Sequence, residues 1–202
     1  MVRIGRVHTG TGDGGETSLI DGTRVGKEDP RVSLYGSIDE LNSQIGVVRM
    51  ELERMPGISR FHRPSEANEA LGRVQQELFD IGGECSGTPE KLPKQMVLIG
   101  VDECERLVEE MDAWLEELEP LESFIMPTGS APVAFLHVAR TVARRAEREG
   151  CILRKIEGEG SVRGEVISYL NRISDWLFVL SRWIAKNTGE EEVLWIPLGK
   201  RE

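Results

Sequence analysis

The sequence predicts an all-α fold, a five-helix bundle with left-handed, coiled-coil-like packing. Two observations predict it: apolar residues recur at three- and four-residue spacing in five segments, and strand-like alternation is almost absent. The 202 residues fit one domain, which is long enough to bury a core without disulfides. We divide it into a glycine-rich N-terminal loop (1–30), the helical bundle (31–189) and a tail (190–202).

The first three helices are predicted over about 30–52, 71–87 and 102–118. Asp29 followed by Pro30 is a typical helix start, since Asp caps the helix and Pro suits its first position. For the third helix, Asp102 with Glu105 three residues later resembles a capping box. The polar, proline-bearing segment 57–67 receives no assignment.

The fourth helix is expected over 131–149, ending at Gly150, and the fifth over 164–188, closed by Gly189. The fifth helix carries a second apolar stripe, Tyr169, Trp176 and Trp183, beside its first. A helix that is apolar on two sides is central in its bundle or is also covered by another subunit, and we expect both. One short strand is expected near 18–20, and a strand or extended tail at 193–197.

The charge balance is acidic, with 25 basic and 35 acidic side chains and a net charge of −10. Non-specific nucleic-acid binding needs a basic surface, so this class of function is not expected. The start of the chain does not resemble a signal peptide, and no run approaches the roughly 20 apolar residues of a membrane span. The three cysteines form no Cys-x-x-Cys motif. We therefore expect a cytoplasmic protein without membrane attachment.

A glycine- and hydroxyl-rich stretch, 9–18, precedes the first helix. Glycines allow backbone N–H groups to converge on an anion, and Lys27 is placed to fold back onto this loop. The segment 22–27 is one residue too short for a phosphate-binding Walker motif, and Glu28 stands where that motif needs Ser or Thr. A phosphate-binding loop and a flexible N-terminal arm both remain open.

Arginines at 140, 144 and 148 lie four residues apart, which aligns three guanidinium groups along one helix face. Arginine suits bidentate contact with phosphate or carboxylate, so this face is a candidate anion site. The alternative is a solvated basic face paired with Glu147 and Glu149.

Other polar groups are less specific. Asn171, Ser174 and Asp175 share a polar stripe that is typical of a hydrogen-bond network between helices, and Asp39 is most simply an exposed carboxylate. His137 lies among apolar neighbours and is expected in the core. The sequence lacks a His-Glu-x-x-His zinc motif, a Glu-x-x-His di-iron motif and a Gly-x-Ser-x-Gly elbow.

Taken together, these segments resemble the PduO-type ATP:cob(I)alamin adenosyltransferases. The resemblance rests on the glycine-rich stretch 9–18, which we call the head loop, and on six further segments. These occur in the order Lys27–Val32, Tyr35–Asn42, Gln75–Gly82, Ile125–Pro127, Arg144–Arg148 and Leu170–Asp175. The resemblance covers roughly 7–195. Any one of these motifs is weak, but together in register they are specific.

The resemblance implies a homotrimer with active sites between subunits. It implies transfer of the 5′-deoxyadenosyl group of ATP to cob(I)alamin, with Mg²⁺, giving adenosylcobalamin and tripolyphosphate. A reductase and a cobalamin-dependent acceptor enzyme are further partners that it implies. The alternatives are a non-catalytic trimeric bundle that binds ATP or delivers adenosylcobalamin, and a purely structural bundle with a solvated arginine face.

By motif, the resemblance assigns ATP contacts to Thr9, Gly10, Thr11, Gly12, Thr17, Ser18, Lys27, Arg144, Arg145, Ala146, Glu147, Arg148 and Asn171. It implies catalytic roles for Asp39, Phe124, Arg140 and Arg144: Arg140 pairs with Asp39 of a neighbouring subunit, and Phe124 lies against the corrin and displaces its lower axial ligand. Protein ligands for the metal are not assigned. The chain departs from the family at Gly10 and Gly14, where family members carry lysines, which removes two positive charges from the loop.

Overall fold

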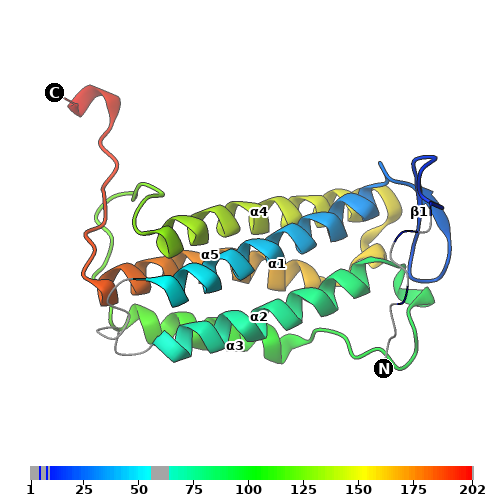
Figure 1. The fold of residues 1–202 in the computed structure, drawn as a ribbon, viewed down its shortest axis with the longest axis horizontal. Helices are drawn as coiled ribbons and strands as arrows, with labels where there is room; N and C mark the ends of the chain where they lie inside the picture. Colours follow the sequence, from blue (N-terminus) through cyan, green and yellow to red (C-terminus); the bar gives the residue numbers. More distant parts are fainter. Residues whose placement is uncertain (1–4, 6–7, 9, 56–63, 202) are drawn as a thin grey trace.

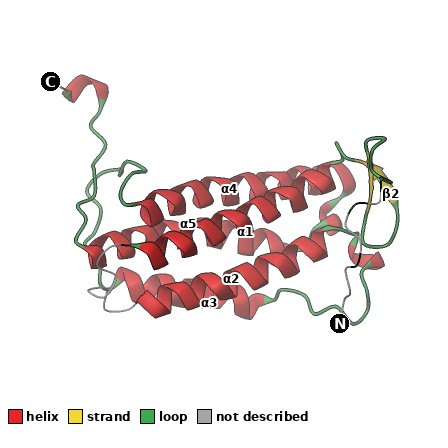
Figure 2. Ribbon diagram, in the orientation of Figure 1, coloured by secondary structure: helices red, strands yellow, loops and turns green. Residues whose placement is uncertain are grey.

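A computed structural model describes residues 5, 8, 10–55 and 64–201, and within them the chain forms five α-helices (Figure 1). The helices are α1 (Pro30–Arg54), α2 (Pro64–Cys85), α3 (Val101–Leu115), α4 (Ala131–Glu157) and α5 (Gly164–Thr188). α1 packs against α2 and α4, while α5 packs against α3 and α4. The helix-dominated fold is confirmed (Figure 2). None of the described helices has the length and apolar character needed to cross a bilayer.

The N-terminal loop contains a small hairpin, where we had expected a single strand. Strands β1 (Glu16–Ser18) and β2 (Arg24–Gly26) pair antiparallel at one end of the bundle (Figure 1). The Asp21 carboxylate accepts hydrogen bonds from the backbone and the hydroxyl of Thr23 at 2.9 and 2.7 Å, and Gly22 takes a positive φ of 83°. These bonds, with a smaller contribution from Lys91, lower the pKa of Asp21 to about 2. A local turn motif thus builds the hairpin.

Helix α4 continues to Glu157, so the predicted end at Gly150 is wrong. Gly150 is buried inside the helix, and a Cβ there would lie 2.7 Å from Ile167 Cδ1. The glycine serves close helix packing and not termination. The helix ends instead at Gly158, whose φ of 102° favours glycine.

Helix α3 is shorter than predicted and begins one residue earlier. It starts at Val101, and the Glu103 carboxylate accepts a 2.8 Å hydrogen bond from the backbone N–H of Gly100. The predicted pairing of Asp102 with Glu105 is therefore wrong by two residues. The helix ends at Leu115 and not near Leu118. Helix α2 runs from Pro64 to Cys85, so it begins seven residues before the predicted start at 71 and ends two residues before the predicted boundary at 87. Of the unassigned segment 57–67, the described residues 64–67 form the first turn of this helix.

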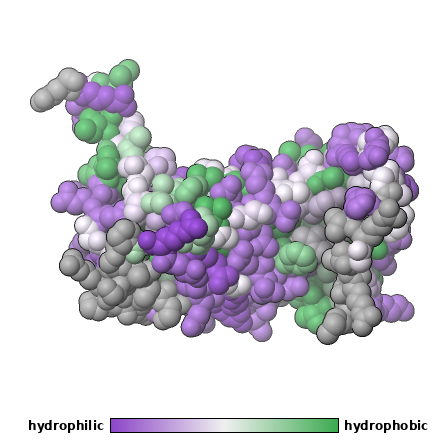
Figure 3. Space-filling model, in the orientation of Figure 1, coloured by the Kyte–Doolittle hydropathy of each residue, from purple (hydrophilic) through white to green (hydrophobic). Residues whose placement is uncertain are grey.

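Short 3₁₀ helices lie between and after the main helices. They are η2 (Pro89–Lys91), η3 (Glu159–Ser161) and η4 (Leu198–Lys200). The tail is extended, and a single antiparallel bridge joins its Leu194 to Ile125. Figure 3 shows apolar residues along the part of the tail that projects from the bundle.

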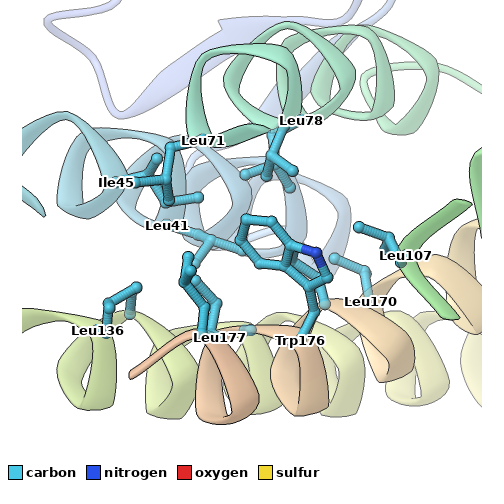
Figure 4. Close-up of a cluster of buried hydrophobic side chains, with 14 of the residues drawn as sticks. Leu41, Ile45, Leu71, Leu78, Leu107, Leu136, Leu170, Trp176 and Leu177 are labelled. Atoms are coloured by element: carbon cyan, nitrogen blue, oxygen red, sulfur yellow. The ribbon is translucent and has the colours of Figure 1, made fainter. Parts of the chain in front are cut away.

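The aromatic stripe of α5 belongs to the core, and Figure 4 shows Trp176 of this stripe among apolar side chains of the other helices. Trp176 and Trp183 are fully buried, and their rings lie 5.3 and 5.8 Å from that of Trp114 on α3. Tyr169 is fully buried as well. Helix α5 is central, as expected, but α3 of the same chain covers its second stripe. The expectation that another subunit covers this stripe is therefore wrong.

A polar network crosses this core between α2, α3 and α5. The Tyr169 hydroxyl donates to Glu77 at 2.6 Å, and Arg73 and Arg106 donate to the same carboxylate at 3.1 and 3.2 Å. Burial is the largest cause that raises the pKa of Tyr169 well above its ordinary value, and Glu77 adds to it. The phenol therefore stays protonated and acts as a permanent donor.

Replacing Tyr169 with Phe removes this donor from a carboxylate that is itself buried. We expect a loss of about 1–3 kcal/mol in the free energy of unfolding, measured by chemical denaturation. The chain's other tyrosine, the half-buried Tyr35, provides the matched control, and Tyr35→Phe should change stability by less than about 0.5 kcal/mol. Equal effects of the two substitutions would contradict the role of the network.

Arg31, just inside α1, is buried and joins three segments at the hairpin end of the bundle. Its guanidinium donates to the carbonyls of Cys85 and Gly87 at 3.2 and 2.6 Å. It also donates to the Glu157 carboxylate at 2.5 Å and to the Ser161 carbonyl at 3.3 Å. These bonds fix the start of α1 relative to the ends of α2 and α4.

Candidate functional site

The described part of the head loop, residues 10–18, folds against Lys27 as the sequence predicted. The backbone N–H of Lys27 donates to the Gly15 carbonyl at 2.8 Å. A Cβ placed on Gly12 would lie 3.4 Å from Lys27 Nζ, so the ammonium group closes over that glycine. Thr9 lies outside the described residues. The loop thus brings one cation to backbone groups that glycine leaves open.

Arg24 braces the same loop, and the sequence reading missed it. From β2 its guanidinium donates to the Thr11 carbonyl at 2.9 Å, to Glu16 at 3.2 Å and to the Ser18 hydroxyl at 3.3 Å. Gly10 and Gly14 supply no charge, but the fold places two cations, Arg24 and Lys27, against the loop. A hairpin register that pairs Ser18 with Arg24 creates this contact.

The arginine face of α4 is only partly neutralised. Among the described residues, no ion pair involves Arg140, Arg144 or Arg148. Arg148 donates at 2.9 Å to the carbonyl of Arg144, and both side chains are exposed. Arg145 has its own partners, the Ser37 hydroxyl and the Glu40 carboxylate. Like charges one turn apart repel, so this face favours an anion.

Glu147 does not neutralise these arginines, contrary to the solvated-face alternative. Its carboxylate accepts a 2.9 Å hydrogen bond from Asn171 of α5. The carbonyl oxygen of the Asn171 side chain in turn accepts from Arg172 at 2.8 Å. Asn171 therefore links the two helices, as a helix–helix hydrogen bond would, and stands beside the arginine face.

A cavity of about 590 Å³ opens beside the N-terminal half of α4, at the end of the bundle away from the hairpin (Figure 1). Its lining residues are Leu121, Glu122, Ser123, Phe124, Ile125, His137, Arg140, Phe178 and Trp195. Phe124 is 78% exposed, so most of its apolar ring is accessible to a ligand in this cavity. A mostly apolar pocket with a few polar groups is typical of a site for a large organic ligand.

Trp195 of the tail forms part of this wall, and sequence reasoning had not included it. Its ring lies edge-on to that of Phe124, with centroids 6.1 Å apart and planes at 73°. Its backbone N–H donates to the Phe124 carbonyl at 2.7 Å. The only sequence signal was an apolar tail after the last helix.

Arg140 and Asp39, which the resemblance pairs across an interface, do not pair within this chain. Asp39 is exposed on α1, and Arg140 Nε is buried without a hydrogen-bond partner. Burial, with a smaller effect of Arg144, lowers the pKa of Arg140. A buried guanidinium nitrogen without an acceptor indicates an unfilled interaction.

His137 is 4% exposed, as expected for a core residue, yet it also lines the cavity. Burial is the main cause that lowers its pKa; Arg140 lowers it further and Glu192 opposes this. The folded protein therefore favours neutral imidazole. Its contribution to stability is complete above the unfolded pKa of about 6.5 and is lost as the pH falls through the folded value.

We therefore expect the melting temperature to fall between pH 6.5 and 5 more steeply in the wild type than in His137→Gln. Melting curves over this range, with the exposed His8→Gln as control, measure the difference. Identical slopes for the wild type and His137→Gln would show that this imidazole does not contribute.

The described residues bring the candidate groups together in two places and not in one. The head loop lies at the hairpin end of the bundle, and the Phe124 cavity lies at the tail end (Figure 1). The α4 arginines lie between them on the helix that runs from one end to the other. Among the described residues, no cluster of His, Cys, Asp and Glu could hold a metal ion.

Comparison with known proteins identifies the family. Residues 7–184 match the cobalamin adenosyltransferase family model. The chain is 39% identical to a cobalamin adenosyltransferase of Cupriavidus metallidurans, over 96% of this chain and 95% of that protein. It is 37% identical to a corrinoid adenosyltransferase of Bacillus subtilis, over 93% and 91%.

The fold is similar to that of solved structures. One is a variant of the PduO-type ATP:corrinoid adenosyltransferase from Lactobacillus reuteri complexed with cobalamin and ATP. It superimposes with a TM-score of 0.82 at 28% identity, over 95% of this chain and all of that one. With a five-helix bundle, a glycine-rich head loop and a family match along most of its length, the chain belongs to the cobalamin adenosyltransferase family.

Proposed function

We propose that the protein transfers the 5′-deoxyadenosyl group of ATP to the cobalt of cob(I)alamin, giving adenosylcobalamin and tripolyphosphate. The observation that carries this proposal is the set of arginines on α4 without ion pairs, in a chain whose net charge is −10. Arg144 and Arg148, one turn apart, are best explained by an anionic ligand, while Arg140 is proposed to pair with a carboxylate of a neighbouring chain.

The leaving group is an entire triphosphate, so the transition state gathers negative charge there. Arg144 and Arg148 on α4 and Lys27 beside the head loop supply positive charge for this purpose. Backbone N–H groups of the head loop and the hydroxyls of Thr11, Thr17 and Ser18 supply further donors. Thr9, Gly10, Arg145, Ala146, Glu147 and Asn171 complete the proposed nucleotide contacts.

The corrinoid is proposed to occupy the cavity beside Phe124. The apolar side chains of Ile125, Phe178 and Trp195 exclude water from the cobalt, and Phe124 takes the position next to it. Co(I) is itself the nucleophile and attacks C5′ of ATP, so the protein needs no nucleophile or general base. This agrees with the absence of such motifs from the sequence.

Mg²⁺ is proposed to enter with the triphosphate. Mg²⁺ prefers phosphate oxygens and water to an all-protein cage. The described residues offer no such cage, and we assign no protein ligand and derive no step from the ion.

A homotrimer would unite the two ends of the site. In one chain the head loop and the Phe124 cavity lie at opposite ends of the bundle (Figure 1), and in the proposed trimer a second chain would bring them together. The Arg140 Nε without a partner supports the same arrangement, because Asp39 of a neighbour would supply its missing acceptor. Sedimentation of the wild type and of Asp39→Ala tests this assembly.

The activity is tested by mixing the protein with ATP, Mg²⁺ and chemically reduced cobalamin. We expect a light-sensitive product with a Co–C bond and an equal amount of tripolyphosphate. If ATP raises the melting temperature but neither product forms, the non-catalytic carrier is the better description. If ATP has no effect at all, the arginine face is structural.

A further inference from the structure

The loop that carries Phe124 has little structure of its own. It runs from 116 to 130, between α3 and α4, and we call it the lid loop. Its middle pairs with the tail: Met126 N–H donates to the Val193 carbonyl at 2.7 Å, and a bridge joins Ile125 to Leu194. The Ser123 hydroxyl donates to the Trp195 carbonyl at 3.3 Å. The tail segment 190–195, which we call the strap, therefore holds the lid loop.

The strap is fastened to the bundle by a buried arginine on α5. Arg182 is 6% exposed, and it donates through Nε and a terminal nitrogen to the two carboxylate oxygens of Glu192 at 2.6 and 3.3 Å. The same terminal nitrogen donates at 2.9 Å to the carbonyl of Glu119, in the first part of the lid loop. One guanidinium thus joins the core, the strap and the lid loop.

A second carboxylate fastens the other end of the lid loop. The backbone N–H of Ser130 donates to Glu190 at 2.6 Å, and the hydroxyl of Thr188 donates to the other oxygen of Glu190 at 2.8 Å. The loop is therefore held at Glu119, at its middle and at Ser130, always by α5 or by the strap that follows it. The exposed ring of Phe124 owes its position to these attachments.

We propose that Arg182 is a positioning residue of the corrinoid site: through Glu192 and the Glu119 carbonyl it fixes the strap and hence Phe124. This rests on the proposed function, because Phe124 matters only if the adjacent cavity binds corrinoid. Arg182 does not line that cavity and acts through other residues. Removing a partner from such a pair leaves a buried charge unpaired, and a terminal segment releases locally before the bundle unfolds.

The chain contains a matched control for Arg182. Arg163, immediately before α5, likewise binds a buried carboxylate and a carbonyl: it donates to Glu84 at 2.6 Å and to the Ile99 carbonyl at 2.5 Å. It also forms a 3.3 Å ion pair with the Glu165 carboxylate. This pair lies at the other end of α5 and holds neither the strap nor the lid loop. Arg163→Met therefore removes a comparable pair without touching Phe124.

Fluorescence reports the strap independently of activity. Trp114, Trp176 and Trp183 are at most 2% exposed, whereas Trp195 is 40% exposed. In Arg182→Met and Glu192→Gln we expect stronger acrylamide quenching and a red-shifted emission. Arg163→Met should leave both signals as in the wild type. Glu192→Gln changes only the tail, so it remains informative if Arg182→Met does not fold.

Kinetics then test the link to the site. We expect Arg182→Met to lower kcat/KM for the corrinoid by about 10-fold or more while KM for ATP changes less than about 2-fold. Arg182→Lys keeps the positive charge but not the two-pronged hydrogen bonding of the guanidinium group, so its kcat/KM should fall between those of the wild type and Arg182→Met. The proposal would be overturned if acrylamide quenching in Arg182→Met and Glu192→Gln equalled that of the wild type. An equal loss of kcat/KM for the corrinoid in Arg163→Met would also overturn it. A wild type without transferase activity would overturn the proposed function, and the quenching would still decide whether Arg182 fixes the strap.

Discussion

Replacing Arg144 with alanine is expected to abolish most of the stabilisation that ATP gives to the protein. At an ATP concentration 100 times the dissociation constant, the wild type should gain about 2.7 kcal/mol, or roughly 5–10 °C in melting temperature. A charged hydrogen bond to phosphate contributes about 1.5–3 kcal/mol. Arg144→Ala should therefore keep only about 0.3–1.3 kcal/mol of this gain, and the same ATP concentration should raise its melting temperature by about 1–5 °C.

The same substitution should lower kcat/KM for ATP by roughly 10²–10³-fold, as expected for a donor that faces developing negative charge. Arg54→Ala is the control, because Arg54 is exposed at the far end of α1 and its loss removes the same charge. The arginine face is not the phosphate site if both variants retain the full ATP-dependent shift. A second measurement is the dependence of ATP affinity on salt concentration. This dependence should be smaller in Arg144→Ala than in the wild type and should not change in Arg54→Ala.

Phe124→Ala is expected to impair the corrinoid step without harming the fold. The ring is largely exposed, so the free energy of unfolding should change by less than about 0.5 kcal/mol. A phenylalanine covered by a ligand contributes about 1.5–3 kcal/mol, so kcat/KM for the corrinoid should fall by about 10–100-fold. KM for ATP should not change, because the proposed nucleotide contacts lie in the head loop and on α4, away from the lid loop that carries Phe124.

Phe79→Ala is a close control for this substitution. Phe79 is 73% exposed on α2, against 78% for Phe124, but it lines no part of the cavity. Its removal should leave both substrates' kinetics unchanged. A Phe124→Ala enzyme with wild-type corrinoid kinetics would exclude this ring from the reaction.

The helices could be predicted from the sequence because each follows a local rule. Spacing of apolar residues found all five, and the Asp29 cap is present, with its carboxylate accepting from the backbone N–H of Arg31 at 2.8 Å. Gly150 shows where local rules fail. A glycine that ends a helix and a glycine that lets two helices approach look alike until the neighbour, here Ile167, is known.

The prediction of what covers the second stripe of α5 was wrong for the same physical reason. The spacing of Tyr169, Trp176 and Trp183 shows that this face is covered, but periodicity does not say by what. Only tertiary packing shows that Trp114 of the same chain does so.

The residues of the candidate site likewise fall into those that a local sequence pattern predicts and those that depend on tertiary contacts. The arginine face follows from helical periodicity, and Lys27 follows from its place after a glycine loop. Arg24, Trp195 and Arg182 depend on hairpin register or on contacts between segments far apart in the sequence, as between Arg182 and Glu119. No local pattern contains that information.

The buried guanidinium of Arg31 has a consequence for how variants of this protein are interpreted. Arg31 binds the ends of α2 and α4, and the backbone N–H of Ile20 in the hairpin donates to the Ser86 carbonyl at the end of α2, so the buried core helps to set the orientation of the head loop. A substitution at Arg31 would imitate a defect in nucleotide affinity although the residue is almost completely shielded from solvent. Conversely, a head loop transplanted from a relative would keep its geometry only if the acceptors of Arg31 were preserved with it.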